Sequence, residues 1–194
     1  MTGSATPPER YGAVAVALHW LIGAALVAQI AFGFLLDDVA PRGTALRGSV
    51  INLHKSIGMV LGVLVLLRIA WRLSHPPAPA PSWSRARRLG VAIGHAALYA
   101  CMVVMPLSGY LASNFSRHGV RWFGHPLAPW GPDSPRWYDA LIAIHDTTAL
   151  MLVVLVAGHV AMALRHRSDG DGVTLWRMRR RGRIRSAIDD PVGL

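Results

Sequence analysis

Four long apolar runs, separated by polar or proline-rich connections, dominate the pattern of hydrophobic and polar positions along the chain. Each run is long enough to cross the hydrocarbon core of a bilayer as a helix, which takes about 20 residues. The predicted spans are residues 12–36, 50–71, 89–113 and 139–164. Since the connections between these antiparallel spans are mostly short, we predict an all-α membrane protein, an up-down-up-down bundle of four transmembrane helices.

The segments between and after the spans carry most of the charge. Residues 1–11 are predicted to form a short N-terminal end, residues 12–165 the membrane domain and residues 166–194 a basic tail. Arginines cluster in the connection 72–90 and in the tail, whereas the other two connections carry fewer. Because Lys and Arg concentrate on the cytoplasmic side of membrane proteins, both termini are predicted to be cytoplasmic.

The composition supports a membrane protein and excludes two other classes. Of the 194 residues, 53% are hydrophobic and only 15% are charged, although the net charge is +10. The positive charge lies between and after the spans, so we expect membrane lipid rather than nucleic acid as a partner. The single Cys101 cannot pair within the chain, and the absence of a Cys-x-x-Cys-His motif excludes covalent attachment of a c-type haem.

Histidines inside the spans are the candidate functional residues, because ionisable side chains are costly in a membrane and usually functional there. His145 and His159 lie fourteen residues apart on the fourth span. At about 1.5 Å and about 100° per residue, they are about 21 Å apart along the axis and within about 40° of one face. In the predicted orientation, His54 joins His145 in an outer layer, and His19 joins His159 in an inner layer, where His95 is a third candidate.

Paired histidines from facing helices are a common way for a bundle to hold a b-type haem. A porphyrin needs room beside each ligand, and residue i+4 lies next to residue i on a helix. Four of the histidines have a small residue there: Gly23 after His19, Gly58 after His54, Ala149 after His145 and Ala163 after His159. His95 is followed by Tyr99, so we predict that it is not a ligand. The alternative interpretation of the small residues is close helix packing, which Gly58-x-x-x-Gly62 also fits.

The sequence thus predicts two non-covalent haems b, with iron ligands in two pairs: His54 with His145 in the outer layer and His19 with His159 in the inner layer. Arg68 follows His54 by fourteen residues and reaches the inner layer, where it could bind a haem propionate. An arginine that snorkels at the end of a span is the alternative. Lys55, and more weakly Arg47, are candidates for the outer propionates.

Short motifs surround these residues over nearly all of residues 10–180. They are His19-Trp20, Leu53-His54-Lys55-Ser56-x-Gly58, Arg68-x-x-Trp71-Arg72, His95-x-x-Leu98-Tyr99, Met105-Pro106-x-Ser108-Gly109-Tyr110, His145 and Gly158-His159. In this combination the chain resembles the bacterial cytochrome b561 family of four-helix, di-haem inner-membrane cytochromes. The resemblance implies two haems b, a location in the bacterial inner membrane, and electron exchange with ubiquinone or a redox partner protein. It also implies superoxide oxidation in some members and a third-span histidine that is kept without binding iron.

Three functions follow from these observations. We expect a membrane cytochrome that transfers electrons across or within the inner membrane, with superoxide:ubiquinone oxidoreductase as a candidate activity. A metal-ion or proton transporter would instead need histidines and carboxylates at one depth near the midplane. The histidines here divide between two depths, and apart from Asp139, the first residue of the fourth span, Asp146 is the one acid within a span. An accessory membrane-anchor subunit would share the haems and differ in its partner.

Four cations near the outer connections could attract an anionic electron donor such as superoxide. They are Arg47, Lys55, Arg117 and Arg121. The alternative is that these side chains bind propionates and lipid headgroups.

Overall fold

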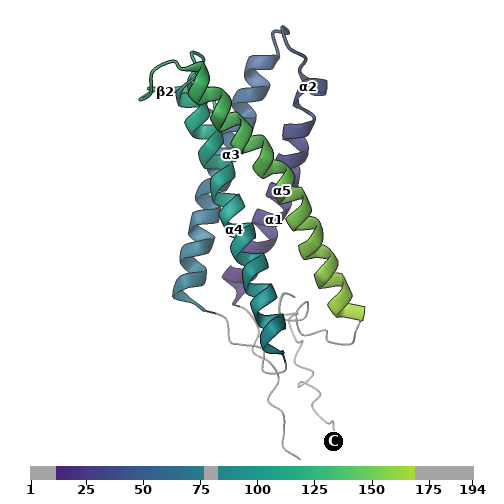
Figure 1. Ribbon diagram of the computed structural model, residues 1–194. Coiled ribbons are helices and arrows are strands. Elements are labelled where there is room, and N and C mark those ends of the chain that lie inside the picture. The colour runs from purple at the N-terminus through teal and green to yellow at the C-terminus, as the bar shows by residue number, and fades with distance from the viewer. Residues whose placement is uncertain (1–11, 77–82, 169–194) are drawn as a thin grey trace, which may run out of the picture.

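A computed structural model describes residues 12–76 and 83–168. The predicted end 1–11, part of the 72–90 connection and residues 169–194 of the basic tail lie outside these residues. The described part contains four long helices, a one-turn helix and a small hairpin (Figure 1). In chain order they are α1 (Ala13–Phe34), α2 (Leu36–Val39), α3 (Arg47–Ser74), α4 (Arg85–Asn114), β1 (Val120–Trp122), β2 (His125–Leu127) and α5 (Pro135–Ser168). The predicted bundle of four membrane helices is confirmed.

The four long helices are each long and apolar enough to cross a membrane. Their outward faces carry large apolar side chains that water would not favour; Val154, for example, is 71% exposed and Leu66 56%. Such an apolar exterior suits hydrocarbon, which gives these side chains a matching solvent. The chain is therefore a multi-pass membrane protein.

Successive long helices run in opposite directions (Figure 1). One end of the bundle holds α2, the hairpin and the start of α5; we call it the outer end. The other holds the start of α1, the end of α3, the start of α4 and the end of α5, and we call it the inner end.

Helix α5 packs along α4, α1 packs along α3, and α3 joins the two pairs by packing against α4. All four helices contribute to a buried apolar cluster in the middle of the bundle: Ile22, Leu26, Ile30, Leu61, Val65, Cys101 and Leu152. In hydrocarbon, such a cluster is stabilised by close van der Waals packing rather than by removal from water.

Pro106 lies inside α4, which nevertheless continues to Asn114. Its ring packs against Gly62 of α3, where an added Cβ atom would lie 3.1 and 3.2 Å from two proline ring carbons. Gly62 is thus a helix-packing residue, as the alternative interpretation of the Gly58-x-x-x-Gly62 spacing proposed. Close approach at glycine is a usual way for membrane helices to pack.

The structure differs from the predicted elements at the helix ends and in the longest connection. Helix α3 begins at Arg47 rather than at residue 50, and α4 begins at Arg85 rather than at residue 89, because polar turns extend both helices beyond the apolar run. Within the connection between the third and fourth spans, β1 and β2 form an antiparallel hairpin that pairs Val120 with Leu127. No strand was predicted there.

Candidate functional site

Four histidines from three helices meet in two pairs, one towards each end of the bundle. The outer pair is His54 of α3 and His145 of α5, whose ring centres lie 6.3 Å apart. The inner pair is His19 of α1 and His159 of α5, with ring centres 6.1 Å apart. Leu152 lies seven residues from each α5 histidine and is fully buried, so the apolar cluster separates the pairs.

The spacing of each pair fits two imidazoles on opposite sides of one metal. A metal–imidazole bond is about 2 Å and a ring centre lies about 1 Å farther out, so such ring centres are about 6 Å apart. Both pairs have this spacing. The donor set, two neutral imidazoles, is one that binds haem iron.

In the outer pair, α4 fixes the ring of His145. Its Nδ1–H donates to the carbonyl of Met105, at 2.9 Å. One turn further along α4, an added Cβ atom at Gly109 would lie 3.0 Å from that same nitrogen. The hydrogen bond places the ring proton on Nδ1 and leaves Nε2 as the nitrogen that can bind a metal.

Helix α1 contacts the other outer histidine at the corresponding ring nitrogen, but here the neighbouring side chain presents a donor. The amide nitrogen of Gln29 lies 3.1 Å from Nδ1 of His54 and 2.6 Å from its backbone carbonyl oxygen. One turn further along α1, an added Cβ atom at Gly33 would lie 3.2 Å from Cε1 of His54. Phe32 also meets this ring edge-on, with ring centres 5.5 Å apart.

In the inner pair, the guanidinium of Arg68 contacts His19. One arm donates to Nδ1 of His19 at 3.3 Å and the other to the carbonyl of Ala15 at 3.0 Å. Arg68 thus lies at the depth that the fourteen-residue spacing from His54 predicts. The inner site is cationic, whereas uncharged groups contact Nδ1 of both outer histidines.

His95 of α4 also lies in the inner layer. Its ring centre is 5.5 Å from that of His159, closer than the spacing of the two pairs. Its Nδ1–H donates to the carbonyl of Val91 in the same helix, at 2.8 Å. The structure therefore brings three imidazoles together here, and the exclusion of His95 as a ligand stays a prediction.

The small residues expected beside the ligands have different surroundings. A Cβ atom added at Gly23 would have no neighbour within 4 Å, so the space at Gly23, one turn from His19, is open. One added at Gly58 would lie 3.5 Å from the amide nitrogen of Gln29. The space one turn from His54 is therefore bordered by a polar side chain from α1.

Two of the outer cations are bound within the protein. The ammonium of Lys55 donates to the carbonyl of Gly119 in the hairpin connection, at 3.3 Å. Arg47 pairs with Asp37 at 2.6 Å and donates to the carbonyls of Leu36 and Ala40, so it ties the α2 turn to α3. The contacts of Arg47 are thus those of a loop anchor rather than of a propionate ligand.

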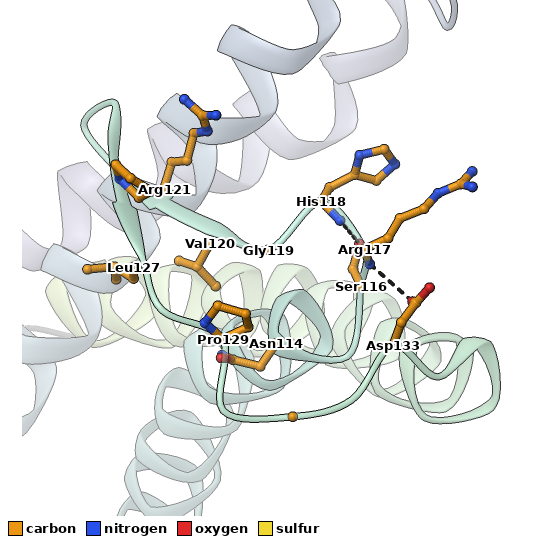
Figure 2. A pocket seen from close by; sticks show the side chains of 12 residues that line it. Asn114, Ser116, Arg117, His118, Gly119, Val120, Arg121, Leu127, Pro129 and Asp133 are labelled. Atoms are coloured by element: carbon orange, nitrogen blue, oxygen red, sulfur yellow. Dashed lines mark hydrogen bonds between the residues drawn. The ribbon is translucent and has the colours of Figure 1, made fainter.

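The other two outer cations, Arg117 and Arg121, are exposed. Within the described part of the chain, neither side chain forms an ion pair. Both border a cavity of about 340 Å³ at the outer end, together with His118, Asp133 and buried Asn114 (Figure 2). The cavity is lined in part by Gly119, whose carbonyl accepts a hydrogen bond from Lys55. Lys55 follows His54 in the sequence, so this contact links the cavity to the outer pair.

A family model for prokaryotic cytochrome b561 matches residues 10–181. The chain belongs to the prokaryotic cytochrome b561 family. It is similar to cytochrome b561 homolog 2 of Escherichia coli (strain K12), with 35% identity over 177 residues, 88% of this chain and 92% of that protein. It is also similar to cytochrome b561 homolog 1 of the same strain, at 25% identity over 175 residues, 88% and 97% of the two chains. A Yersinia pestis protein named probable superoxide oxidase CybB is 27% identical over 174 residues, 88% and 96% of the two chains.

Membership of the cytochrome b561 family makes this chain a membrane electron-transfer protein and implies haem b as its cofactor. The two imidazole pairs fit that cofactor in donor type and in spacing. Among the described residues, no group of three or more His, Cys, Asp or Glu side chains could hold a bare metal ion.

Sequence reasoning missed the residues that hold the outer pair from neighbouring helices: Gln29, Gly33, Met105 and Gly109. A signal was present for two of them. Gln29 is a lone amide in an apolar run, and Gly109 belongs to the Met105-Pro106-x-Ser108-Gly109 motif. Which histidine each residue would meet depends on how the helices pack, and spacing along the sequence does not give this.

Proposed function

We propose that this protein is a di-haem b cytochrome that passes electrons between the two ends of its bundle. His54 and His145 hold the outer haem, and His19 and His159 hold the inner haem. The observation that carries the proposal is the pair of imidazole–imidazole contacts, 6.3 and 6.1 Å between ring centres, at two depths. Haem b supplies reversible one-electron transfer at its iron.

The proposal gives two cations a role beside these ligands. When Nε2 of His19 binds a metal, Nδ1 carries the ring proton and no longer accepts a hydrogen bond from Arg68. That arm of the guanidinium is then free for a propionate carboxylate. Lys55 adjoins His54 and could serve the outer propionates if its ammonium left the carbonyl of Gly119.

The proposal also includes the orientation of the protein in the membrane, the electron donor and the electron acceptor. We place the chain in the bacterial inner membrane with both termini in the cytoplasm. The arginines at the start of α4 lie at the inner end, and those of the tail follow α5 in the sequence. The proposed donor is superoxide at the outer end: each of two superoxide ions loses one electron and leaves as dioxygen. Ubiquinone takes both electrons and two protons and becomes ubiquinol. The name of the Yersinia pestis relative and the exposed Arg117 and Arg121 support this donor.

A membrane-anchor subunit that passes electrons to a partner enzyme would use the same haems. The activity of the purified protein separates the two possibilities, because an anchor subunit would transfer electrons to ubiquinone only with its partner enzyme present.

Removal of each proposed ligand tests the site. Every haem depends on one histidine of α5 and one of another helix, so His54→Ala and His145→Ala should remove one haem, and His19→Ala and His159→Ala the other. Haem content by pyridine haemochrome, with midpoint potentials to identify the haem that is left, measures this. His95→Ala is the matched control and should keep both haems. If His95→Ala loses a haem while His19→Ala keeps both, the inner assignment is wrong.

A further inference from the structure

Gln29 is a polar side chain inside the apolar bundle, only 7% exposed. Its helix, α1, supplies no ligand to the outer pair. The amide contacts one residue twice: the nitrogen lies 3.1 Å from Nδ1 of His54 and 2.6 Å from the carbonyl oxygen of His54. An amide without a hydrogen-bond partner is costly in hydrocarbon, and the two contacts with His54 provide that partner.

Each outer histidine has the same two neighbours on an adjacent helix: a polar group at Nδ1 and, one turn later, a glycine. On α1, Gln29 contacts Nδ1 of His54, and Gly33, one turn later, leaves room for that ring. On α4, the carbonyl of Met105 accepts from Nδ1 of His145, and Gly109, one turn later, leaves room for that ring. In the inner pair, the corresponding nitrogen of His19 meets a cation instead.

We propose that Gln29 is the positioning residue of His54: its amide occupies Nδ1, fixes the ring and leaves Nε2 to the iron. The inference rests on the proposed function, in which His54 is an axial ligand. It assigns to Gln29 the role that the Met105 carbonyl has for His145.

The chemistry of a metal-bound imidazole determines which amide atom acts. With iron on Nε2, Nδ1 carries the ring proton and needs a hydrogen-bond acceptor. Gln29 provides one when its side-chain amide flips by about 180°, so that the oxygen rather than the nitrogen faces Nδ1. The carbonyl of His54 then loses its second donor and keeps the bond of its own helix. Because two acceptor oxygens repel at the present 2.6 Å, the amide must also move away from this carbonyl as it turns. An acceptor on Nδ1–H makes the imidazole a stronger donor to iron, which favours the oxidised state and lowers the midpoint potential.

The test uses purified holoprotein and two substitutions with opposite expected effects. Gln29→Leu keeps much of the volume and removes the acceptor, so the midpoint potential of the outer haem should rise. Gln29→Glu replaces the amide oxygen with a carboxylate, so the potential should fall. A tenfold change in the redox equilibrium corresponds to about 59 mV for one electron. The low-spin ferric EPR signal of the outer haem should move in both variants, and that of the inner haem should stay.

The control is Thr148→Val, which removes another buried polar group near the outer pair. The hydroxyl of Thr148 bonds to the carbonyl of Ile144 in its own helix and does not contact His54, so the potential should not change. If Gln29→Leu loses the outer haem and Gln29→Glu retains it, the positioning role is supported. Loss in both variants, or unchanged potentials and EPR signals in both, overturns it.

His54→Ala separates this inference from the proposed function. If His54→Ala retains two haems, His54 is not a ligand, and the proposed function fails together with the role of Gln29. If His54→Ala loses the outer haem but the potential of Gln29→Leu matches the wild type, the proposed function stands and the positioning role alone is wrong.

Discussion

At the scale of single residues, each outer histidine lies beside a glycine of a neighbouring helix, where an added Cβ atom would crowd the ring. Sequence spacing directed attention to Gly58 and Ala149, which follow His54 and His145 by four residues on their own helices. The rings instead meet Gly33 of α1 and Gly109 of α4. A contact between helices depends on their rotation and depth relative to one another. The spacing of residues within one helix does not determine either.

Gly109→Ala tests whether this close contact positions a ligand. The added methyl group would lie 3.0 Å from Nδ1 and 3.1 Å from Cε1 of His145, so the ring must shift. We expect the outer haem to be lost at least in part, or retained with an altered ferric EPR signal, and the inner haem to be unaffected.

The matched control is Gly90→Ala, also in α4, where an added Cβ atom would meet nothing within 4 Å. Alanine in a helix is favoured over glycine by about 1 kcal/mol, so both substitutions should help α4 itself. Loss of haem in Gly109→Ala alone would therefore come from the contact with His145. A Gly109→Ala protein with full outer haem and an unchanged spectrum would contradict the interpretation.

At the scale of elements, the helices were predictable and the hairpin was not. Runs of apolar residues give the four membrane helices directly, because hydrocarbon leaves the backbone few alternatives. Each strand of the hairpin has only three residues, and the stretch also contains the turn residues Gly119 and Gly124, both at positive φ. Its aromatic residues are typical of the membrane–water interface and do not by themselves indicate a strand.

Ser56 connects this hairpin to α3. Its side chain is fully buried, and its Oγ accepts from the backbone N–H of Phe123 at 2.8 Å. The hydroxyl proton has two acceptors in reach, the carbonyls of Asn52 at 2.7 Å and Arg121 at 3.2 Å. Phe123 has a φ of 47°, a strained left-handed conformation for a bulky residue, so this bond helps to hold an unfavourable turn.

Ser56→Ala should release the hairpin while the helices stay intact. The part-buried N–H of Phe123 would lose its partner, at a cost of up to about 1–3 kcal/mol, the range for a fully buried group. Amide hydrogen exchange over residues 120–127 should therefore become faster, with little change in α4 and α5. Ser49→Ala is a suitable control, because this exposed serine of α3 bonds to the carbonyl of Leu46, outside the hairpin. Equal protection of residues 120–127 in wild type and Ser56→Ala would show that the hairpin does not depend on this hydroxyl.

At the scale of the whole molecule, the two histidine layers were predictable because α5 carries both and a helix has a fixed rise and turn. The structure places His54 beside His145, and both His19 and His95 beside His159, so the pairing of the ligands stays a prediction. The positive charge of the outer end was less predictable. Of the four cations counted there, Arg47 is paired with Asp37 and Lys55 is bonded to a carbonyl, so the charge presented to an approaching anion comes mainly from Arg117 and Arg121.

The proposed superoxide donor gives the last prediction, measured by stopped-flow reduction of the oxidised protein. Exposed charges of one sign raise the on-rate of an oppositely charged substrate by tenfold or more, and salt screens them beyond about 10 Å at 0.1 M. Arg117→Gln with Arg121→Gln should therefore slow the reaction several-fold at low salt and have little effect at high salt. Arg85→Gln with Arg88→Gln makes a matched change of charge at the inner end and should leave the rate unchanged. Lys55→Gln should act differently, by loosening the connection at Gly119, so its effect should persist at high salt. A slow reduction that is indifferent to salt and to all of these substitutions would exclude superoxide and leave a quinol or a protein as the donor.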